Sequence, residues 1–379
     1  MYKQRMTVLI TLLTVSFLST ETAFPAPQKR EAPPTRKFDA PGSPTFVRLN
    51  AKPGLNPPLD VNGDFLIGPD YASAPENKVV EGVPQGKVQQ FVIDSKDTKL
   101  LNPGIAREVF GTVDPANPKT LIVETHEIDY QRQITVYVPA QYVPGSEAPF
   151  MVIHDGPKGK PNMTVPHILD NLIAQKRAPA MIAIMIANGG GDAQGHQRGK
   201  EYDTMSGLFA EYIETEVLPR VEKNCDVKLT NDPDGRAAMG SSSGGSAALI
   251  MAWYRTDLYH RVLTTSGTFV NQQWPFNPET PGGAWDFHDK LIPESPKKPL
   301  RLFLAVGDRD NFNPNVMRDD MHDWVEANNR MAKVLKAKGY KYQYLFCQNS
   351  GHGVGNAKAQ FLPHAIEWVW KEYVPKQNE

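Results

Sequence analysis

The chain has 379 residues, a formal net charge of −1 and an apolar fraction of 40%. The length allows one large domain or two ordinary ones, and the apolar fraction is enough for a sizeable core, which excludes global disorder. The near-neutral charge argues against nucleic acid as the main partner, because phosphate binding needs a clear basic excess.

The N-terminal residues 1–26 have the pattern of an export signal. Lys3 and Arg5 precede an apolar stretch from Met6 to Leu18, and small and polar residues follow it. Because this stretch is too short to span a bilayer comfortably, we predict a cleaved signal, with an uncleaved anchor as the alternative. The protein is therefore expected in the periplasm or as a secreted protein. The rest of the sequence predicts no stable membrane insertion after signal removal.

The chain contains two cysteines, Cys225 and Cys347. In an exported protein they could pair as one disulfide, and the alternative is two separate buried thiols. Their spacing does not match the C-x-x-C pattern of zinc sites.

Residues 27–82 are rich in proline and glycine and have little periodicity, which is typical of a linker or a surface-wrapping arm. One folded domain is predicted after it, over residues 83–379. Short apolar runs of strand type alternate in that domain with segments of helical periodicity. The predicted strands are residues 88–93, 120–138, 149–154, 181–186, 236–239, 261–265, 300–306 and 341–346, and the predicted helices are residues 208–221, 245–254, 324–338 and 363–373. This alternation predicts an α/β fold with a mostly parallel sheet that is covered on both faces.

The segment Gly240–Gly244 reads Gly-Ser-Ser-Ser-Gly and fits the pattern G-x-S-x-G with Ser242 at its centre. In such a strand-to-helix turn the serine is strained, and its neighbours must be very small for the chain to pass. The composition alone also fits a flexible linker, but the apolar residues on both sides, 237–239 and 247–253, argue against that. We therefore predict Ser242 as a nucleophile and the N–H of Ser243, at the start of the helix, as an oxyanion donor.

An acid and a histidine are expected after Ser242, in the order serine, acid, histidine. His352 lies in a loop of small residues directly after the strand at 341–346, where the base is expected. Two aspartates, Asp308 and Asp310, follow the preceding strand. We favour Asp310 because it stands in a G-x-x-D arrangement after the strand, and Asp308 is the alternative. The acid would orient the imidazole and stabilise its charged form, while the other aspartate would cap a helix.

A second oxyanion donor is expected in the loop after the strand at 149–154. Pro157 has no N–H, so the neighbouring Gly156 is the best candidate, because a glycine backbone can approach a ligand closely. A plain surface turn is the alternative. Residues 308–313 faintly resemble a calcium loop, but Phe312 occupies a position that needs an oxygen ligand, so no metal is expected.

Taken in chain order, these segments resemble the putative-esterase family of α/β-hydrolases, which includes enterochelin esterases, feruloyl esterases and esterase D. The resemblance extends from near Pro84 to the C-terminus. The segments that carry it are Asp155-Gly156, Arg198–Tyr202, Gly240–Gly245, Gly307–Asp310 and Ser350–His352. It implies an α/β-hydrolase three-layer sandwich with a mostly parallel central sheet. It also implies that Ser242, Asp310 and His352 form the triad and that no cofactor is needed.

The chain departs from this family at its N-terminus. Enterochelin esterases often carry an extra N-terminal β-domain, whereas only the proline-rich arm precedes the catalytic region here, which argues against siderophore hydrolysis. The segment 269–289 is rich in tryptophan, proline and phenylalanine, and it follows a strand where hydrolases often insert a cap over the substrate. We predict that Trp274 and Trp285 bind substrate in a pocket wall, with a packed surface loop as the alternative.

These predictions describe a serine esterase that acts on a small-molecule or carbohydrate-linked ester. Ser242 attacks the ester carbonyl while His352 takes its proton, and water then releases the acyl group. An acyltransferase that uses an alcohol in place of water is one alternative. A non-catalytic binding protein that kept the fold is the other.

Overall fold

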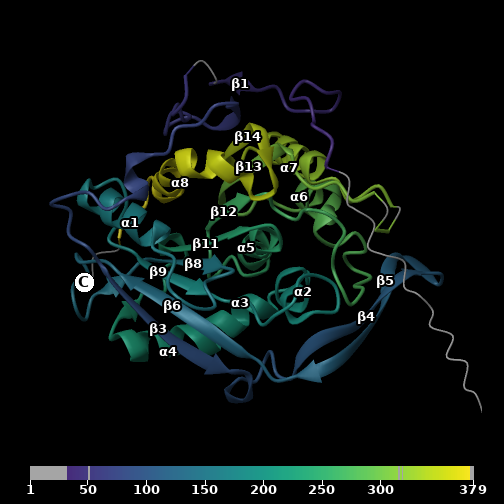
Figure 1. Cartoon of the computed structure of the whole chain (residues 1–379), viewed down its shortest axis with the longest axis horizontal. Helices are drawn as coiled ribbons and strands as arrows, with labels where there is room; N and C mark the ends of the chain where they lie inside the picture. The colour runs from purple at the N-terminus through teal and green to yellow at the C-terminus, as the bar shows by residue number, and fades with distance from the viewer. Residues whose placement is uncertain (1–31, 50–51, 315, 318, 376–379) are drawn as a thin grey trace, which may run out of the picture. The chain divides into compact units, whose positions relative to one another are not determined.

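The centre of the fold is a ten-stranded sheet with the strand order β1-β2-β14-β13-β12-β11-β8-β9-β6-β3. It is seen in the computed structural model, which describes residues 32–49, 52–314, 316–317 and 319–375 (Figure 1). The predicted export signal, residues 1–26, lies outside the described residues.

The strands and helices follow one another along most of the chain. The strands are β1 (Val47–Arg48), β2 (Gly63–Ile67), β3 (Lys87–Asp94), β4 (Gly104–Asp114), β5 (Asn117–Ile128), β6 (Gln131–Val138), β7 (Glu147–Ala148), β8 (Phe150–His154), β9 (Ile182–Ile186), β10 (Lys228–Leu229), β11 (Arg236–Ser241), β12 (Arg261–Thr265), β13 (Arg301–Arg309) and β14 (Lys341–Gly351). The helices are α1 (Thr164–Ala174), α2 (Gln197–Tyr202), α3 (Leu208–Tyr212), α4 (Leu218–Cys225), α5 (Ser243–Tyr254), α6 (Ile292–Glu294), α7 (Trp324–Ala337) and α8 (Gly355–Trp370).

The strands from β1 to β9 in this order pair in parallel, and β6 is antiparallel to both β9 and β3. The prediction of a mostly parallel sheet is therefore confirmed. Because parallel strands end at the same edge, the carboxyl ends of β8, β11, β12, β13 and β14 lie together. Ligands of open α/β sheets bind at this edge.

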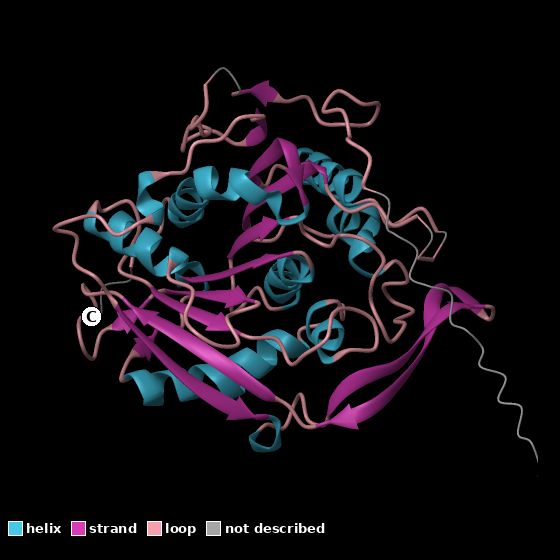
Figure 2. Ribbon diagram, in the orientation of Figure 1, coloured by secondary structure: helices cyan, strands magenta, loops and turns pink. Residues whose placement is uncertain are grey.

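Alternate residues of each central strand face two different cores. In β8, Phe150 and Val152 belong to the core that includes α3, α5 and α7, while Met151 and Ile153 belong to the core that includes α1 and α8. All five residues of β8, β9 and β12 are buried, as expected for strands that are covered on both faces. The helices thus form a layer on each side of the sheet, and the predicted three-layer α/β-hydrolase sandwich is confirmed (Figure 2).

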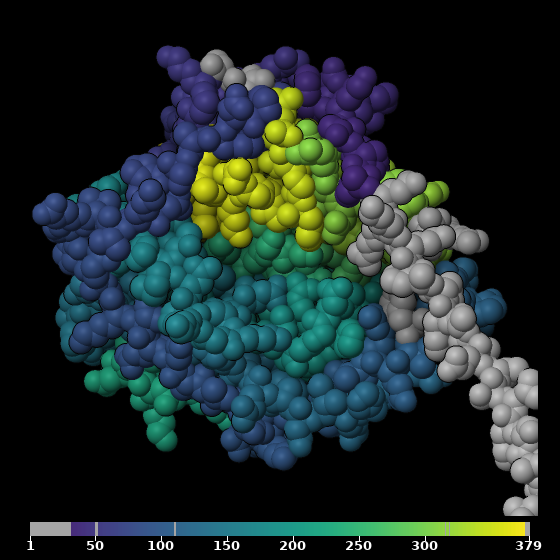
Figure 3. All heavy atoms as spheres, in the orientation of Figure 1, coloured from purple at the N-terminus to yellow at the C-terminus, as the bar shows by residue number. Residues whose placement is uncertain are grey.

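From Pro33 onward the Pro/Gly-rich arm belongs to the same compact unit as the rest of the fold. Strand β2 pairs in parallel with β14, and its residues Phe65, Leu66 and Ile67 are at most 2% exposed. The burial of these three apolar side chains away from water stabilises the attachment of the arm to the sheet. In the space-filling view the purple and blue arm lies against the yellow C-terminal helix α8, where Gln360 accepts backbone N–H groups of the arm (Figure 3).

Strands β4 and β5 form a hairpin in a sheet of their own, and this hairpin was missed by the sequence analysis (Figure 2). The strand predicted over residues 120–138 is two strands, β5 and β6, and β4 was not predicted. The base of the hairpin is held by α2, since the Ile105 N–H donates to Gln197 Oε1 at 3.0 Å.

Both cysteines, Cys225 and Cys347, are buried free thiols, so the disulfide alternative is wrong. Of the helices in the described part of the chain, none has the length and apolar character of a membrane span.

Candidate active site

Ser242 lies in the tight turn between β11 and α5, at the carboxyl edge of the sheet. Its backbone has φ 58° and ψ −132°, a conformation that costs energy for any residue with a side chain. A Cβ atom at Gly240 would lie 2.1 Å from the Gly244 carbonyl oxygen, so only glycine fits there. The strand-to-helix turn expected from the G-x-S-x-G pattern is therefore present.

Asp310 and His352 are in direct contact at the same edge. His352 Nδ1 and Asp310 Oδ1 are 2.6 Å apart, and Asp310 is 1% exposed. The other carboxylate oxygen of Asp310 accepts a hydrogen bond from Ser266 Oγ at 2.5 Å, and Asn311 N–H donates to Oδ1 at 2.7 Å. A carboxylate with these donors is held in one orientation toward the imidazole.

The alternative acid, Asp308, has a different set of contacts. Its two oxygens accept the backbone N–H groups of Asn349 and Ser350 at 2.8 and 3.0 Å. Asp308 thus holds the loop that leads to His352, and the structure pairs Asp310, not Asp308, with the histidine. The helix-capping role expected for the second aspartate belongs to Asp323 instead, whose Oδ1 accepts from Val325 N–H at 3.0 Å.

Ser242 and His352 are linked through a threonine and a tryptophan that the sequence analysis did not single out. Ser242 Oγ is 3.4 Å from Thr268 Oγ1, which accepts the indole N–H of Trp324 at 3.1 Å. The Trp324 ring packs edge-on against the His352 ring, with centroids 6.2 Å apart. Among the described residues, the Ser242 hydroxyl bonds to Thr268 and not to the histidine. A catalytic hydrogen bond of this kind is often long without substrate and tightens when substrate binds.

The two predicted oxyanion donors, the N–H groups of Ser243 and Gly156, differ in their hydrogen bonding. Ser243 is the first residue of α5, so its N–H is one of the first-turn donors without an acceptor within the helix. The Gly156 N–H, in contrast, donates to the Ile186 carbonyl at 2.9 Å. A Cβ atom at Gly156 would also lie 2.6 Å from the backbone of Met185. The prediction for Gly156 is therefore wrong, because this glycine packs against β9 and its N–H is already used.

Trp274 and Trp285, the two predicted substrate contacts, sit differently in the segment 269–289. Trp285 is 5% exposed, its ring lies edge-on to His288 with centroids 4.5 Å apart, and the Arg330 guanidinium lies 4.8 Å from the ring centroid. The prediction for Trp285 is therefore corrected, because this side chain packs in the interior against α7. Trp274 is half-buried, and its contact with substrate stays a prediction.

The segment Arg198–Tyr202, one of those that carry the family resemblance, attaches α2 to the loop after β8. Arg198 donates to both oxygens of Asp155, at 3.0 and 2.8 Å, and the Tyr202 hydroxyl accepts the Asp155 N–H at 3.1 Å. Burial opposes the charge of Asp155, but the hydrogen bonds from Arg198 outweigh it and lower the pKa of that carboxyl. Asp155 is therefore a charged structural partner, and its conformation at φ 54° is held from two sides.

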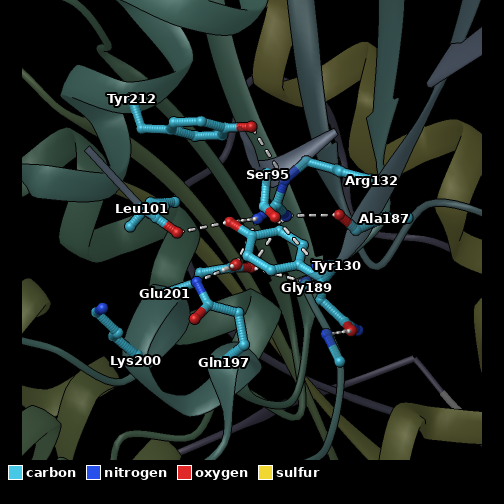
Figure 4. A network of polar contacts seen from close by, with 12 residues as sticks. Ser95, Leu101, Tyr130, Arg132, Ala187, Gly189, Gln197, Lys200, Glu201 and Tyr212 are labelled. Atoms are coloured by element: carbon cyan, nitrogen blue, oxygen red, sulfur yellow. Dashed lines mark hydrogen bonds and ion pairs between the residues drawn. The ribbon is translucent and has the colours of Figure 1, made fainter. Parts of the chain in front are cut away.

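Glu201, in the same segment, forms a buried ion pair with Arg132 (Figure 4). Both side chains are fully buried, and Arg132 also donates to the Ala187 carbonyl at 2.7 Å and to the Tyr212 hydroxyl at 3.1 Å. Such a pair is stable only when its remaining donors and acceptors are satisfied, as they are here. The network joins β6, the end of β9 and α2 beneath the Asp155 loop.

A polar cluster next to the turn was also missed by the sequence analysis. Ser243 Oγ donates to Asp203 Oδ2 at 3.2 Å, and Gln272 Nε2 donates to both of these oxygens, at 3.1 Å to Asp203 and 3.0 Å to Ser243. Burial raises the pKa of Asp203 to about 7, against the opposing effect of Arg198. No sequence signal marked it, because Asp203 and Gln272 belong to no motif and meet only in the fold. In the described part of the chain, no group of three or more acidic, histidine or cysteine side chains could hold a metal ion.

A strained serine turn and an acid–histidine pair at the carboxyl edge of a three-layer sandwich define an esterase-type α/β-hydrolase. The family model described as putative esterase matches residues 125–367, and the chain belongs to that family.

Similar proteins agree with this assignment. An iron(III) enterobactin esterase of Dickeya dadantii (strain 3937) is 27% identical over 169 residues, which are 44% of this chain and 36% of that protein. The match thus spans only about a third of the length of this curated relative. Among solved structures, a ferulic acid esterase has a TM-score of 0.52 and 18% identity over 76% of this chain and 100% of its own. The enterobactin esterase of Shigella flexneri, solved with 2,3-dihydroxy-N-benzoyl-glycine, has a TM-score of 0.53 and 18% identity over 80% of this chain and 64% of its own. At these identities the structures share the fold.

Proposed function

We propose that the protein hydrolyses carboxylic esters through an acyl-enzyme on Ser242. His352 takes the proton of the attacking hydroxyl, and Asp310 holds the imidazole and stabilises its charged form. The Ser243 N–H stabilises the oxyanion at the start of α5. The observation that carries the proposal is the 2.6 Å contact between Asp310 and His352, at the edge where Ser242 sits in its strained turn.

The test is a stopped-flow burst with p-nitrophenyl acetate. We expect a burst of one equivalent per active enzyme in the wild type and none in Ser242→Ala, because the acyl-enzyme forms before water releases it. The matched control is Ser241→Ala, which removes the neighbouring hydroxyl outside the G-x-S-x-G frame. A wild-type protein that is folded but gives neither burst nor turnover would contradict the proposal for simple esters.

The choice of acid is tested separately. Asp310→Asn is expected to lower kcat by about 10³–10⁴-fold, since a neutral amide cannot stabilise the imidazolium. Asp308→Asn is the control, because it keeps the shape of the side chain and one of the two acceptor oxygens that hold the loop before His352, so a smaller loss is expected. An equal loss in both variants would show that the acid cannot be assigned to Asp310.

The proposed substrates are small-molecule esters. The structural neighbours are named for ferulic acid and for enterobactin, and the second was solved with a dihydroxybenzoyl compound. Acetyl, feruloyl and dihydroxybenzoyl esters are therefore the first set to compare by kcat/KM. Preference for the aromatic esters would support an aromatic acyl pocket, and Trp274→Ala would then be expected to raise KM for them.

Residues 1–26 are proposed to direct export. The support is the basic, apolar and small-residue pattern of this segment. N-terminal sequencing of the protein recovered from outside the cytoplasm tests it. Full-length protein found in the cytoplasmic fraction would contradict it.

A further inference from the structure

Trp324, the first residue of α7, contacts His352 directly and Ser242 through Thr268. It is 3% exposed, and its indole N–H donates to Thr268 Oγ1 while its ring packs against His352 at an interplanar angle of 87°. Thr268 is 1% exposed and lies 3.4 Å from Ser242 Oγ. One buried tryptophan is therefore in a position to keep the serine and the histidine in register.

The Thr268 hydroxyl bonds to both Trp324 and Ser242. A threonine hydroxyl has one hydrogen and two acceptor lone pairs. Thr268 Oγ1 accepts the indole N–H of Trp324, which leaves it one lone pair and its own hydrogen for Ser242 Oγ. Thr268 thus ties the Ser242 hydroxyl to Trp324, whichever of the two hydroxyls donates. The backbone is held as well, since the Thr268 N–H donates to the Ser242 carbonyl at 3.1 Å.

The position of Trp324 is set by its neighbour Asp323 and by the acid loop. Asp323 Oδ1 caps α7 by accepting the N–H groups of Val325 and Glu326, at 3.0 and 3.2 Å. The Trp324 N–H donates to the Asn311 carbonyl at 3.1 Å. The start of α7 is therefore attached to the loop that follows Asp310.

Arg36, in the N-terminal arm, fastens these same two segments from outside. Its guanidinium donates to Asp323 Oδ2 through Nε, at 3.0 Å, and through Nη2. Its backbone N–H donates to the Asp308 carbonyl at 2.6 Å, and its guanidinium lies 4.5 Å from the ring centroid of Phe312. The ion pair with Asp323 is only partly exposed, with side-chain exposures of 26% and 11%, so it is weakly screened.

We propose that Thr268 and Trp324 are positioning residues for the esterase reaction, and that Arg36 keeps Trp324 in place. The arm is then a working part of the active site and not a linker. The inference rests on the proposed function, because it concerns how Ser242 and His352 are held. A displacement of about 1 Å in such a group can cost roughly 100-fold in rate, which makes the effect measurable.

The first test compares Thr268→Val with Thr268→Ser. The valine variant keeps the shape and loses the hydroxyl, so we expect kcat for p-nitrophenyl acetate to fall by about 10-fold or more, with KM nearly unchanged. The rate of labelling by a fluorophosphonate probe should fall in parallel, because it reports the reactivity of Ser242 directly. The serine variant should restore both. Trp324→Phe, which keeps a ring against His352 and loses the N–H, should also lower kcat and the labelling rate, but by less than Thr268→Val.

The second test compares Arg36→Ala with Arg48→Ala, another arm arginine whose guanidinium lies over Phe38. Arg36→Ala is expected to lower kcat by about 10-fold, and Arg48→Ala should match the wild type. Arg36→Lys and Asp323→Asn keep a hydrogen bond at this point and should retain more activity. If Arg36→Ala does not fold, these two variants replace it in the comparison of kcat.

Three outcomes would overturn the proposal. The first is a folded Thr268→Val enzyme with wild-type kcat and labelling rate, and the second is a Thr268→Ser enzyme that is as impaired as Thr268→Val. The third is an Arg36 variant that loses thermal stability while its kcat stays at the wild-type value, which would make Arg36 a purely structural residue. A wild type without a burst would instead contradict the proposed function itself.

Discussion

The turn that carries Ser242 and the N-terminal arm that carries Arg36 both reach the candidate active site, but they are built in opposite ways. The turn is made by neighbours in sequence: Gly240 and Gly244 leave room for the chain, and Ser242 takes the strained conformation between them. The arm is held in place by residues that are far away in the sequence. Arg36 bonds to Asp323, 287 residues further on, and Asp64 accepts the Tyr342 hydroxyl across 278 residues.

This difference shows where sequence patterns carry information. A steric constraint between adjacent residues leaves a readable signature, because only certain residue types fit. A long-range contact leaves none, because an arginine that will meet an aspartate looks like any surface arginine. The two regions can nevertheless be equally important for the geometry of the site.

Among the variants that compare the turn with the arm, the largest effect is expected from Gly240→Ala, which tests the local construction of the turn. The added Cβ would lie 2.1 Å from a backbone oxygen that cannot move away without opening the turn. We expect kcat to fall by about 100-fold or more in a protein that is still folded. Esterase kinetics with p-nitrophenyl acetate, together with circular dichroism, measure this.

The control for that variant is Gly159→Ala, where a Cβ would meet nothing within 4 Å. It should behave as the wild type. If Gly240→Ala were also fully active, the turn would have enough freedom to accept a side chain. The contrast between a locally constrained turn and a remotely held arm would then be lost.

A smaller effect, on stability, is expected from Leu66→Ala in β2 of the arm. Leu66 is 0% exposed and belongs to the core that includes α7, so the free energy of unfolding should fall by about 2–5 kcal/mol. Val47→Ala in β1, where the side chain is 57% exposed, should change it by only about 0.5 kcal/mol. Urea unfolding measures both. Equal, small losses would mean that the arm contributes no core.

The smallest effects at neutral pH concern two buried histidines, one under each region. His154 packs beneath Gly244 and has no partner at either ring nitrogen among the described residues, while His364 bonds to Gln343, which in turn donates to two arm carbonyls. Burial lowers the pKa of each to about 4 from 6.5. Since the folded pKa lies below the unfolded one, each neutral histidine contributes stability above pH 6.5. This contribution, about 3 kcal/mol per histidine, is lost as the pH falls from 6.5 to 4.

Replacing each histidine in turn by phenylalanine tests the contribution of the turn and of the arm separately. Both variants should show a flatter loss of unfolding free energy between pH 6.5 and 4 than the wild type. His364→Phe should in addition cost about 1 kcal/mol at neutral pH, because Gln343 loses a hydrogen bond, whereas His154→Phe breaks none. Urea unfolding at a series of pH values decides it, and a wild-type pH slope in either variant would rule out that histidine as the titrating group.

The fold and the acid–histidine pair could be predicted because each depends on the order of the strands and loops along the chain. Alternating strands and helices gave the parallel sheet, and the chain order of Ser242, Asp310 and His352 follows from the order of the strands that end at one edge. The preference for Asp310 over Asp308 came from its spacing after the strand, and Asp310 is the one that contacts His352.

The remaining features needed contacts that no spacing encodes. Gly156 looked like a free donor, but the neighbouring strand β9 supplies an acceptor for its N–H. Trp285 looked like a pocket wall, but α7 covers it with Arg330. The strand β2 was hidden by the prolines and glycines around it, although its three apolar residues are among the most buried of the chain.

The pairing of β2 with β14 has a consequence for how the chain folds. Synthesis begins at the N-terminus, so the apolar residues Phe65–Ile67 are made long before the strand that covers them. Closing this loop is a late and non-local step, of the kind that slows folding. Until β14 is in place, β2 can pair only with the two-residue strand β1, and β13 has an open edge toward other chains. Among the described residues, the first strands are thus placed by the last one, and a nascent chain or a chain truncated before β14 should be the form most prone to aggregate.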